Sequence, residues 1–306
     1  MTRAKTREEA PILSFGQHMI IAGSRMFFGA LTGGIRLFRG AHPKSWRTLR
    51  YGIHREEILD YHAPKPGVVE REAVVFFHGG GWMMGTKDFY SHDLLFLVEA
   101  GHPVFNVEYP KAPEHPHPQM LRSILKALLY VRTSFPSARA VHLMGDSAGG
   151  NLAVMAAVLC SNTELIAHVD PLCEIKKLPA ILSTTSLYGV LDRQTMLLPQ
   201  VPAGTTMLEA YGGPDVLNVE VGPKHCITPM DLSFKRHPPC FLICGGRDVI
   251  LPSTEVYAQR LEREGHAVTM KTYPDSNHGF FNFPDVADKT AVQNDIVAFL
   301  ANLGIR

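Results

Sequence analysis

The sequence lacks the features of several protein classes. Its 306 residues carry a formal net charge of +1 and no run rich in lysine or arginine, so it has no electrostatic footprint for nucleic acid. It also has no internal repeat and no low-complexity segment. A chain of this length suits one large α/β domain or two small ones with a sizeable core. We therefore expect a protein that acts on a small molecule.

Cysteine is scarce and poorly placed for cross-linking. The five cysteines form no CxxC pair and no zinc-like spacing. Cys240 and Cys244 fall in one strand-like run, where residues four apart are too distant to bridge. We expect buried, reduced thiols, which favour a reducing compartment and thus a cytoplasmic protein. No cofactor or metal is expected.

A long uninterrupted hydrophobic run is also missing. Residues 11–40 are apolar, but His18, Arg25, Arg36 and several glycines interrupt them, so we do not expect a transmembrane helix. A signal peptide fits poorly, because two glutamates and a proline precede the apolar part. Two interpretations remain. We prefer amphipathic helices that pack over the main domain, and the alternative is an anchor lying in a membrane interface.

What the sequence does contain, from residue 47 onward, is an alternation of short apolar runs with helical patterns. Candidate strands are Thr48–Ile53, Ile58–His62, Ala73–His78, Val104–Tyr109, Val141–Met144, Ala180–Tyr188, Pro239–Cys244 and Val268–Tyr273. Candidate helices are His92–Ala100, Gln119–Thr133, Ala148–Cys160, Ser253–Glu264 and Val286–Leu303. This alternation predicts an α/β fold with a mostly parallel sheet of about eight strands, covered by helices on both faces. The first two strands, joined by a very short connection, should be antiparallel edge strands.

Residues 189–238 break this rhythm. They are rich in proline and glycine and show little sustained periodicity. A long irregular insertion in a compact domain is usually functional or mobile. Because it falls between two sheet strands, we expect it to rise over one edge of the sheet.

The sharpest chemical signal is the stretch "VHLMGDSAGGNLAVMAAVLC". An apolar strand enters Gly145-Asp146-Ser147-Ala148-Gly149 and a helical pattern leaves it, which is the G-x-S-x-G nucleophile elbow. The flanking glycines allow a tight turn that pushes the Ser147 hydroxyl beyond the sheet, and the following helix supplies free N–H groups. We predict that Ser147 is a catalytic nucleophile.

A serine nucleophile needs a base, and the base needs an orienting acid. In this architecture both follow the serine, acid first, at the ends of strands. Asp248 follows the run "CFLICGGRD" and His278 follows the last strand in "VTMKTYPDSNHGFF". Asp192, which also follows a strand, is an alternative acid. His115 and His117 could suggest a metal, but they lie in the proline-rich turn "PEHPHP", so we predict no metal site.

The glycine run in "VVFFHGGGWMMG" is expected to supply backbone N–H groups for an oxyanion opposite the elbow. Gly79, Gly80 and Gly81 lie on the corresponding loop, and the N–H of Ala148 would be a further donor. A phosphate loop is disfavoured, because Lys87 falls outside the G-x-x-x-x-G-K spacing. His78 is interpreted as a brace of this loop.

These residues resemble the α/β-hydrolase fold and, within it, the hormone-sensitive-lipase-like carboxylesterases. The resemblance is carried by "HGGGW", "YPKAPEHPHP", "GDSAGGNLA", the Asp248 turn and "NHGFF", in order from about residue 70 to 285. It implies a Ser147–His278–Asp248 triad and an oxyanion hole from Gly79, Gly80 and Ala148. It also implies a helical cap, built from the segment 1–46 and the insertion 189–238, over a catalytic domain at 47–306. Asp146 resembles a buried hydrogen-bonding residue beside the elbow.

The resemblance implies a serine carboxylesterase for short- to medium-chain acyl or aryl esters, with no cofactor. Trp82 and Met83, together with Phe15, Met19 and Phe27, could line the acyl pocket or pack in the core. Two alternatives stay open: an amide-directed hydrolase of the arylacetamide deacetylase or arylformamidase type, and a non-catalytic small-molecule receptor on a hydrolase scaffold. The residues do not decide between a monomer and a homodimer.

Overall fold

The fold was obtained as a computed structural model that describes residues 11–39, 45–170, 175–217, 226–282 and 288–303. It contains one eight-stranded sheet in the order β1-β2-β4-β3-β5-β6-β7-β8. The strands are β1 (Arg47–Arg50), β2 (Ile58–His62), β3 (Ala73–Phe77), β4 (Val104–Val107), β5 (Ala140–Asp146), β6 (Ala180–Leu187), β7 (Cys240–Gly245) and β8 (Val268–Tyr273). β1 and β2 pair antiparallel, as does β2 with β4, and all other neighbours are parallel. The predicted mostly parallel sheet and its antiparallel edge are confirmed.

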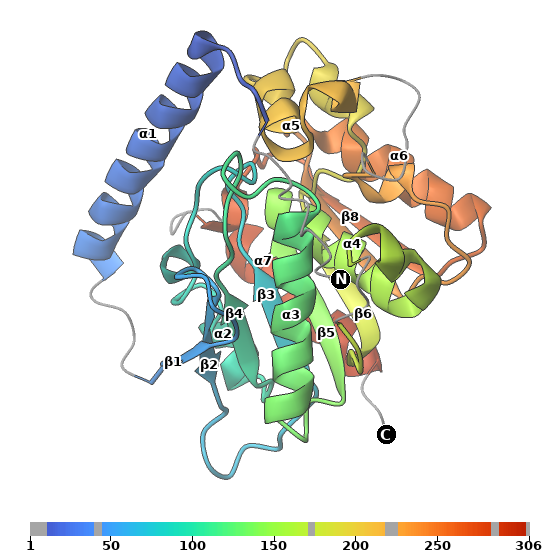
Figure 1. Ribbon diagram of the computed structural model, residues 1–306. Helices are drawn as coiled ribbons and strands as arrows, with labels where there is room; N and C mark the ends of the chain where they lie inside the picture. Colours follow the sequence, from blue (N-terminus) through green and yellow to red (C-terminus); the bar gives the residue numbers. More distant parts are fainter. Residues whose placement is uncertain (1–10, 40–44, 171–174, 218–225, 283–287, 304–306) are drawn as a thin grey trace, which may run out of the picture.

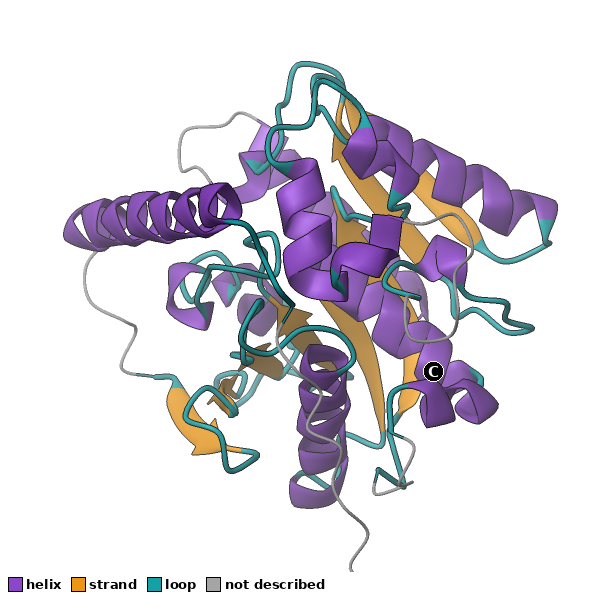
Figure 2. Cartoon of the chain, turned by 45° about the horizontal axis from the view of Figure 1, so that its top comes forward, coloured by secondary structure: helices purple, strands orange, loops and turns teal. Residues whose placement is uncertain are grey.

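Helices cover both faces of the sheet (Figures 1 and 2). The helices are α1 (Phe15–Arg39), α2 (Leu95–Glu99), α3 (Gln119–Ser134), α4 (Ala148–Ser161), α5 (Gly204–Gly212), α6 (Leu251–Arg263) and α7 (Asp288–Leu303). Alternation along β3 divides the core: Val75 and Phe77 face the cluster that contains α3, α4 and α6, while Val74 and Phe76 face the cluster of α2 and α7. Two hydrophobic cores therefore fix the sheet between the two layers.

Several element boundaries differ from the sequence-based prediction. β5 extends through Asp146, so the strand runs up to Ser147 itself. β4 ends at Val107 and the predicted helix at 92–100 is helical only over Leu95–Glu99. The insertion is more regular than expected, because it contains α5. The predicted start of the last helix, at 286–287, lies outside the described residues.

The apolar N-terminal segment forms the single 25-residue helix α1. In Figure 1 it lies along one side of the molecule, apart from the sheet. Among the described residues, no helix combines the length and the apolar character needed to cross a bilayer. Cys160, Cys240 and Cys244 form no disulfide with another described residue, and Cys173 lies outside the described residues.

Candidate active site

Ser147 occupies a sharp turn between β5 and α4. Its backbone adopts φ 51° and ψ −121°, a conformation that costs a residue with a side chain on the order of 1–3 kcal/mol. Its N–H donates to the Leu187 carbonyl at 2.8 Å, which pins the turn to the end of β6. The surrounding structure thus holds the serine hydroxyl in a strained position beyond the sheet, as the G-x-S-x-G pattern predicts.

Gly145 and Gly149, on either side of Ser147, must be glycine because neighbouring backbone atoms lie too close for a side chain. A Cβ at Gly145 would lie 2.2 Å from the Gly149 carbonyl oxygen, and one at Gly149 would lie 2.1 Å from the Phe77 oxygen. The elbow therefore packs directly against the end of β3, which carries the glycine loop. This contact sets the spacing between Ser147 and that loop.

Gly149→Ala should destabilise the protein by about 2 kcal/mol or more, because the new methyl group would overlap the β3 backbone. Helix propensity alone would favour alanine by about 1 kcal/mol. Gly23→Ala is the matched control, since it also lies in a helix and nothing stands within 4 Å of its Cβ position. Urea unfolding of both variants measures the difference. Equal stabilities would show that the elbow tolerates a side chain at this position.

His278 joins Ser147 to Asp248. Its Nε2 lies 3.0 Å from Ser147 Oγ and its Nδ1 lies 2.9 Å from Asp248 Oδ2. The Asp248 side chain is fully buried, and its other oxygen accepts the Ile250 N–H at 2.9 Å. An ionised carboxylate at Nδ1 selects the tautomer whose Nε2 is free to accept the serine proton. This is the geometry of a catalytic triad.

Two glycines bring the acid and the base together. A Cβ at Gly245 would lie 2.2 Å from the Ser276 oxygen, and one at Gly246 would lie 2.5 Å from the Pro274 oxygen. The turn after β7 can therefore lie directly on the loop after β8, which carries His278. The alternative acid Asp192 instead accepts the nearby Gln194 N–H at 3.2 Å, and burial raises its pKa.

The glycine loop contradicts one predicted oxyanion donor. The N–H of Gly79 already donates to Asp146 Oδ1 at 2.7 Å and lies 3.2 Å from the Tyr90 hydroxyl. The prediction of Gly79 as an oxyanion donor is therefore wrong. Gly80 and Gly81, by contrast, line the cavity beside Ser147, so Gly81 replaces Gly79 as the expected partner of Gly80 and Ala148.

The conformation of the loop explains its glycines. Gly80 and Gly81 have φ values of 125° and 55°, which favour glycine. A Cβ at Gly81 would also lie 2.9 Å from Met207 Sδ. Met207 of α5 thus lies directly against the loop, a contact that sequence spacing alone gives no means to find.

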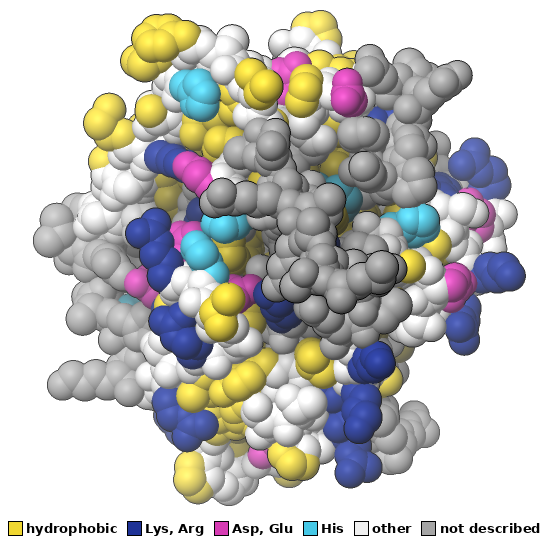
Figure 3. Space-filling model, viewed as in Figure 1, with side chains coloured by type: hydrophobic (Ala, Val, Ile, Leu, Met, Phe, Trp, Pro, Cys, Tyr) yellow, Lys and Arg dark blue, Asp and Glu magenta, His cyan; other side chains and the backbone are white. Residues whose placement is uncertain are grey.

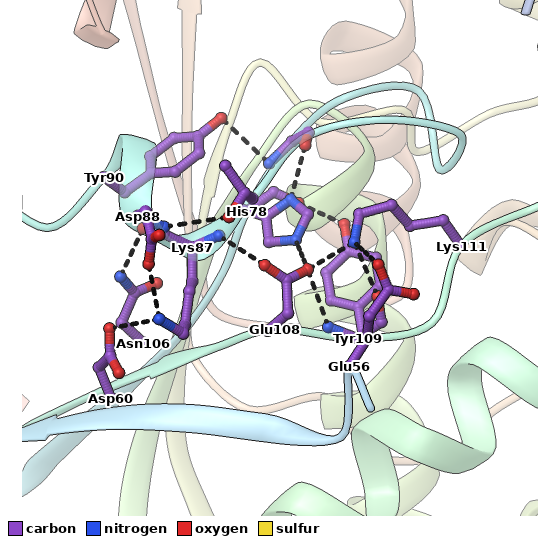
Figure 4. A network of polar contacts seen from close by, with 12 residues as sticks. Glu56, Asp60, His78, Lys87, Asp88, Tyr90, Asn106, Glu108, Tyr109 and Lys111 are labelled. Carbon is purple, nitrogen blue, oxygen red and sulfur yellow. Dashed lines mark hydrogen bonds and ion pairs between the residues drawn. The ribbon is translucent and has the colours of Figure 1, made fainter. Parts of the chain in front are cut away.

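A buried polar network lies behind this loop (Figure 4). His78 Nδ1 lies 2.8 Å from the Gly79 oxygen and Nε2 lies 3.0 Å from Glu108 Oε1, while the ring stacks on Tyr109 at 4.3 Å. Glu108 also accepts from Lys111 Nζ at 2.6 Å. Burial by itself would raise the pKa of Glu108, but His78 and Lys111 outweigh it and hold the pKa well below its ordinary value. His78 braces the loop, as interpreted from the sequence.

Glu108→Gln should destabilise the protein by roughly 3 kcal/mol near neutral pH, because it leaves Lys111 and His78 without their buried anion. A carboxyl whose pKa is lower in the folded state stabilises the protein fully at pH values above its ordinary pKa of 4.5. This stabilisation is lost as the pH falls toward the folded-state pKa. The difference from the natural protein should therefore shrink between about pH 7 and about pH 3. Denaturant unfolding at both pH values measures it, and a difference that grows on acidification would contradict this assignment.

Asp146, the last residue of β5, connects the turn at Ser147 to the glycine loop. Its carboxylate accepts from Gly79 N, from the Tyr90 hydroxyl at 3.1 Å and from Asn282 Nδ2 at 3.2 Å. Burial raises its pKa to about 6, against the opposing effect of these donors. These hydrogen bonds tie it to the glycine loop and to Asn282, which indicates a structural role, consistent with the sequence-based interpretation.

A largely apolar cavity of about 370 Å³ opens at Ser147 and His278. α1 contributes Phe28 and Leu31, and the insertion contributes Met196, Val201 and Met207. Trp82 lines it as predicted and stacks on Tyr211 at 4.6 Å.

Met83 does not line this cavity. It is buried beside a second cavity of about 760 Å³ under α1, whose lining includes Arg25 and Glu108, so its prediction as a residue of the pocket at Ser147 is wrong. The loop turns between the two residues, because Trp82 has a φ of 61°.

Phe15, Met19 and Phe27 were expected to line the pocket or to pack in the core, and they do neither. All three are exposed on the outer face of α1. The inward face is fixed by Arg25, which donates to the Met83 and Ala112 carbonyls at 2.8 Å and pairs with Glu114 at 2.6 Å. Phe28, three residues after Arg25, shares that face. The polar residue in an apolar helix was the available signal for the direction of α1.

The described residues contain no group of three or more His, Cys, Asp and Glu side chains placed to hold a metal ion. His115 instead packs edge-on against His54 at 4.6 Å. His117 is mostly buried, and its ring lies edge-on to Tyr211 at 5.7 Å.

A sheet of this order, with a serine on a strand–helix turn and an acid and a histidine following later strands, defines the class of α/β serine hydrolases. Residues 74–282 match the family described as the alpha/beta hydrolase fold, and the chain belongs to this family. The chain is 26% identical to Lipase 2 of Moraxella sp. (strain TA144) over 277 residues, which cover 76% of this chain and 61% of that protein. It is 28% identical to carboxylesterase NlhH of Mycobacterium tuberculosis, over 71% of this chain and 69% of that protein.

Solved structures show the same fold. Esterase B from Lactobacillus rhamnosis, inhibited by a tributyrin phosphonate, has a TM-score of 0.79 at 19% identity and covers 95% of this chain and 96% of its own. A bacterial heroin esterase has a TM-score of 0.77 at 19% identity, covering 94% of this chain and 92% of its own.

Proposed function

We propose that this protein is a serine carboxylesterase that hydrolyses short- to medium-chain acyl or aryl esters. The observation that carries the proposal is the continuous hydrogen-bonded row Ser147–His278–Asp248 at the wall of an apolar cavity. Relatives named as a lipase and as a carboxylesterase support it.

In the proposed reaction, His278 takes the proton of Ser147 as its Oγ attacks the ester carbonyl carbon. The N–H groups of Gly80, Gly81 and Ala148 stabilise the oxyanion. Collapse breaks the bond to the alcohol oxygen, and His278 returns the proton to this leaving group. Water, deprotonated by His278, then attacks the acyl-enzyme and releases the acid and free Ser147. Asp248 keeps the imidazole oriented and stabilises its charge in both halves.

The cap forms part of this proposal. Segment 1–46 and insertion 189–238 both contribute side chains to the cavity, from α1 and from the region around α5, so we assign them to a cap over the catalytic domain 47–306. Residues 1–10, 40–44 and 218–225 of these segments lie outside the described residues. The buried free thiols Cys240 and Cys244 support a cytoplasmic location.

A panel of p-nitrophenyl esters of increasing chain length, beside one anilide, tests the function. The small apolar cavity should give the highest kcat/KM for short and medium chains and a decline for chains longer than about ten carbons, because further carbons stay in water and add no binding energy. The anilide should react more slowly. A preference for the anilide would favour the amide-directed alternative, and absence of turnover on every substrate would favour the receptor.

A further inference from the structure

The outer face of α1 is apolar and uncovered. Of the exposed large hydrophobic side chains in the described residues, six belong to this helix or to the residues just before it: Ile12, Phe15, Met19, Ile20, Met26 and Phe27. Phe15 is 82% exposed, Met26 76% and Phe27 71%. Figure 3 shows hydrophobic side chains gathered at the upper left, where Figure 1 places α1. We call this surface the α1 outer face.

This arrangement reverses the usual order of a surface helix, which turns its charges to water. Among the exposed positions from 12 to 33, none is Asp, Glu, Lys or Arg. The only charged side chain in that stretch, Arg25, is directed at Glu114 and two carbonyls of the main domain. Exposure of the α1 outer face to water is therefore energetically unfavourable.

Between Glu9 and Glu56 the charged residues of the sequence are all of one sign. From residue 10 to residue 55 the sequence contains no Asp or Glu, and it contains seven cationic residues: Arg25, Arg36, Arg39, Lys44, Arg47, Arg50 and Arg55. Arg47, Arg50 and Arg55, on and after β1, are exposed. An exposed apolar helix next to cations without neighbouring acids in the sequence is complementary to a lipid bilayer, whose interior is apolar and whose surface can be anionic.

We propose that the α1 outer face binds an anionic lipid surface, with α1 lying in the plane of the membrane interface. The acid-free sequence favours this occupant over a second copy of the chain. Two copies joined through α1 would bring two sets of cations together with no carboxylate from this stretch to balance them, whereas lipid phosphates supply that charge. The apolar side chains then enter the boundary between headgroups and acyl chains.

Docking of α1 also has a consequence for the cavity at Ser147. Phe28 and Leu31, on the inward face of the same helix, form part of its wall. In the proposed arrangement, α1 alone would lie between the cavity and the lipid surface. Binding to lipid brings that wall of the cavity to a surface where apolar esters collect.

Vesicle flotation with the full chain tests the proposal. The natural protein should float with vesicles of phosphatidylcholine and phosphatidylglycerol, and less with phosphatidylcholine alone or at high salt. Phe15→Ser combined with Phe27→Ser should lower the partition coefficient by about tenfold or more. Val68→Ser combined with Val69→Ser is the matched control: these exposed apolar residues lie off α1, and their loss should leave binding unchanged.

Melting temperature and hydrolysis of a water-soluble ester should stay the same in both double variants, since neither touches the cavity. The proposal is overturned if the natural protein stays in solution with both vesicle types, or if the α1 variant floats as well as the natural protein. Sedimentation in the absence of lipid tests the alternative occupant, a second copy of the chain. A dimer that the α1 variant dissociates, with no flotation of the natural protein, would assign the α1 outer face to a second copy of the chain.

Discussion

Ser147→Ala should lower kcat for p-nitrophenyl acetate by on the order of 10⁵-fold, because removing the nucleophile disables His278 and Asp248 together. The remaining rate would come from binding and from the oxyanion donors. The fold should persist, since the strained turn is held by the Ser147 N–H bond to Leu187, which alanine keeps. Steady-state kinetics together with a melting curve measure both effects.

Ser186→Ala is the matched control for this variant. Ser186 lies in β6, next to β5 in the sheet, and its buried hydroxyl has no hydrogen-bond partner in the described structure. Its loss should change kcat by less than about twofold, as expected for a side chain that does not touch the reacting atoms. If Ser147→Ala and Ser186→Ala had equal activity, the nucleophile would have to be sought elsewhere.

Asp248→Asn should lower kcat by about 10³- to 10⁴-fold with little change in KM. An amide at this position can no longer stabilise the imidazolium that forms during the reaction, and it can donate to Nδ1 and so select the wrong tautomer of His278. Substrate binding should be preserved, because Asp248 is buried behind the histidine and does not line the cavity. The pH–rate profile and the separate kcat and KM values measure the effect.

Asp192→Asn separates the two acids that the sequence left open. The Asp192 carboxylate bonds to the local backbone at Gln194, so this variant should retain kcat within a few-fold. A large loss in Asp192→Asn with an active Asp248→Asn would reverse the assignment of the acid.

Local signals were sufficient to predict the fold and the row of three side chains. Ser147 directly follows β5, and Asp248 and His278 lie in the loops after β7 and β8. Parallel strands bring such positions to one edge of the sheet. Chain order then distinguished their roles, because the acid precedes the histidine in this architecture. In the fold, the differences were shifted element ends, such as the extension of β5 to Asp146, and the helix α5 within the insertion.

The predictions for the oxyanion donor and for the cavity wall were wrong because contacts between residues far apart in the sequence determine both. Whether the Gly79 N–H is free depends on Asp146, which lies 67 residues away in the sequence, and spacing within the glycine run cannot reveal it. The direction of α1 depends on Glu114 and on two carbonyl groups of the main domain. Arg25 is the only Asp, Glu, Lys or Arg between residues 12 and 33, and it points inward, opposite to the charges of an ordinary surface helix. The cavity wall was therefore the least predictable part of the site.

The most direct test of the central claim, that Ser147 is an activated nucleophile, is labelling with a fluorophosphonate followed by mass spectrometry of the peptides. The account predicts one adduct per chain, on Ser147, and a strongly slowed reaction in His278→Ala, because the hydroxyl needs its base. No adduct, or an adduct on another residue, would contradict it.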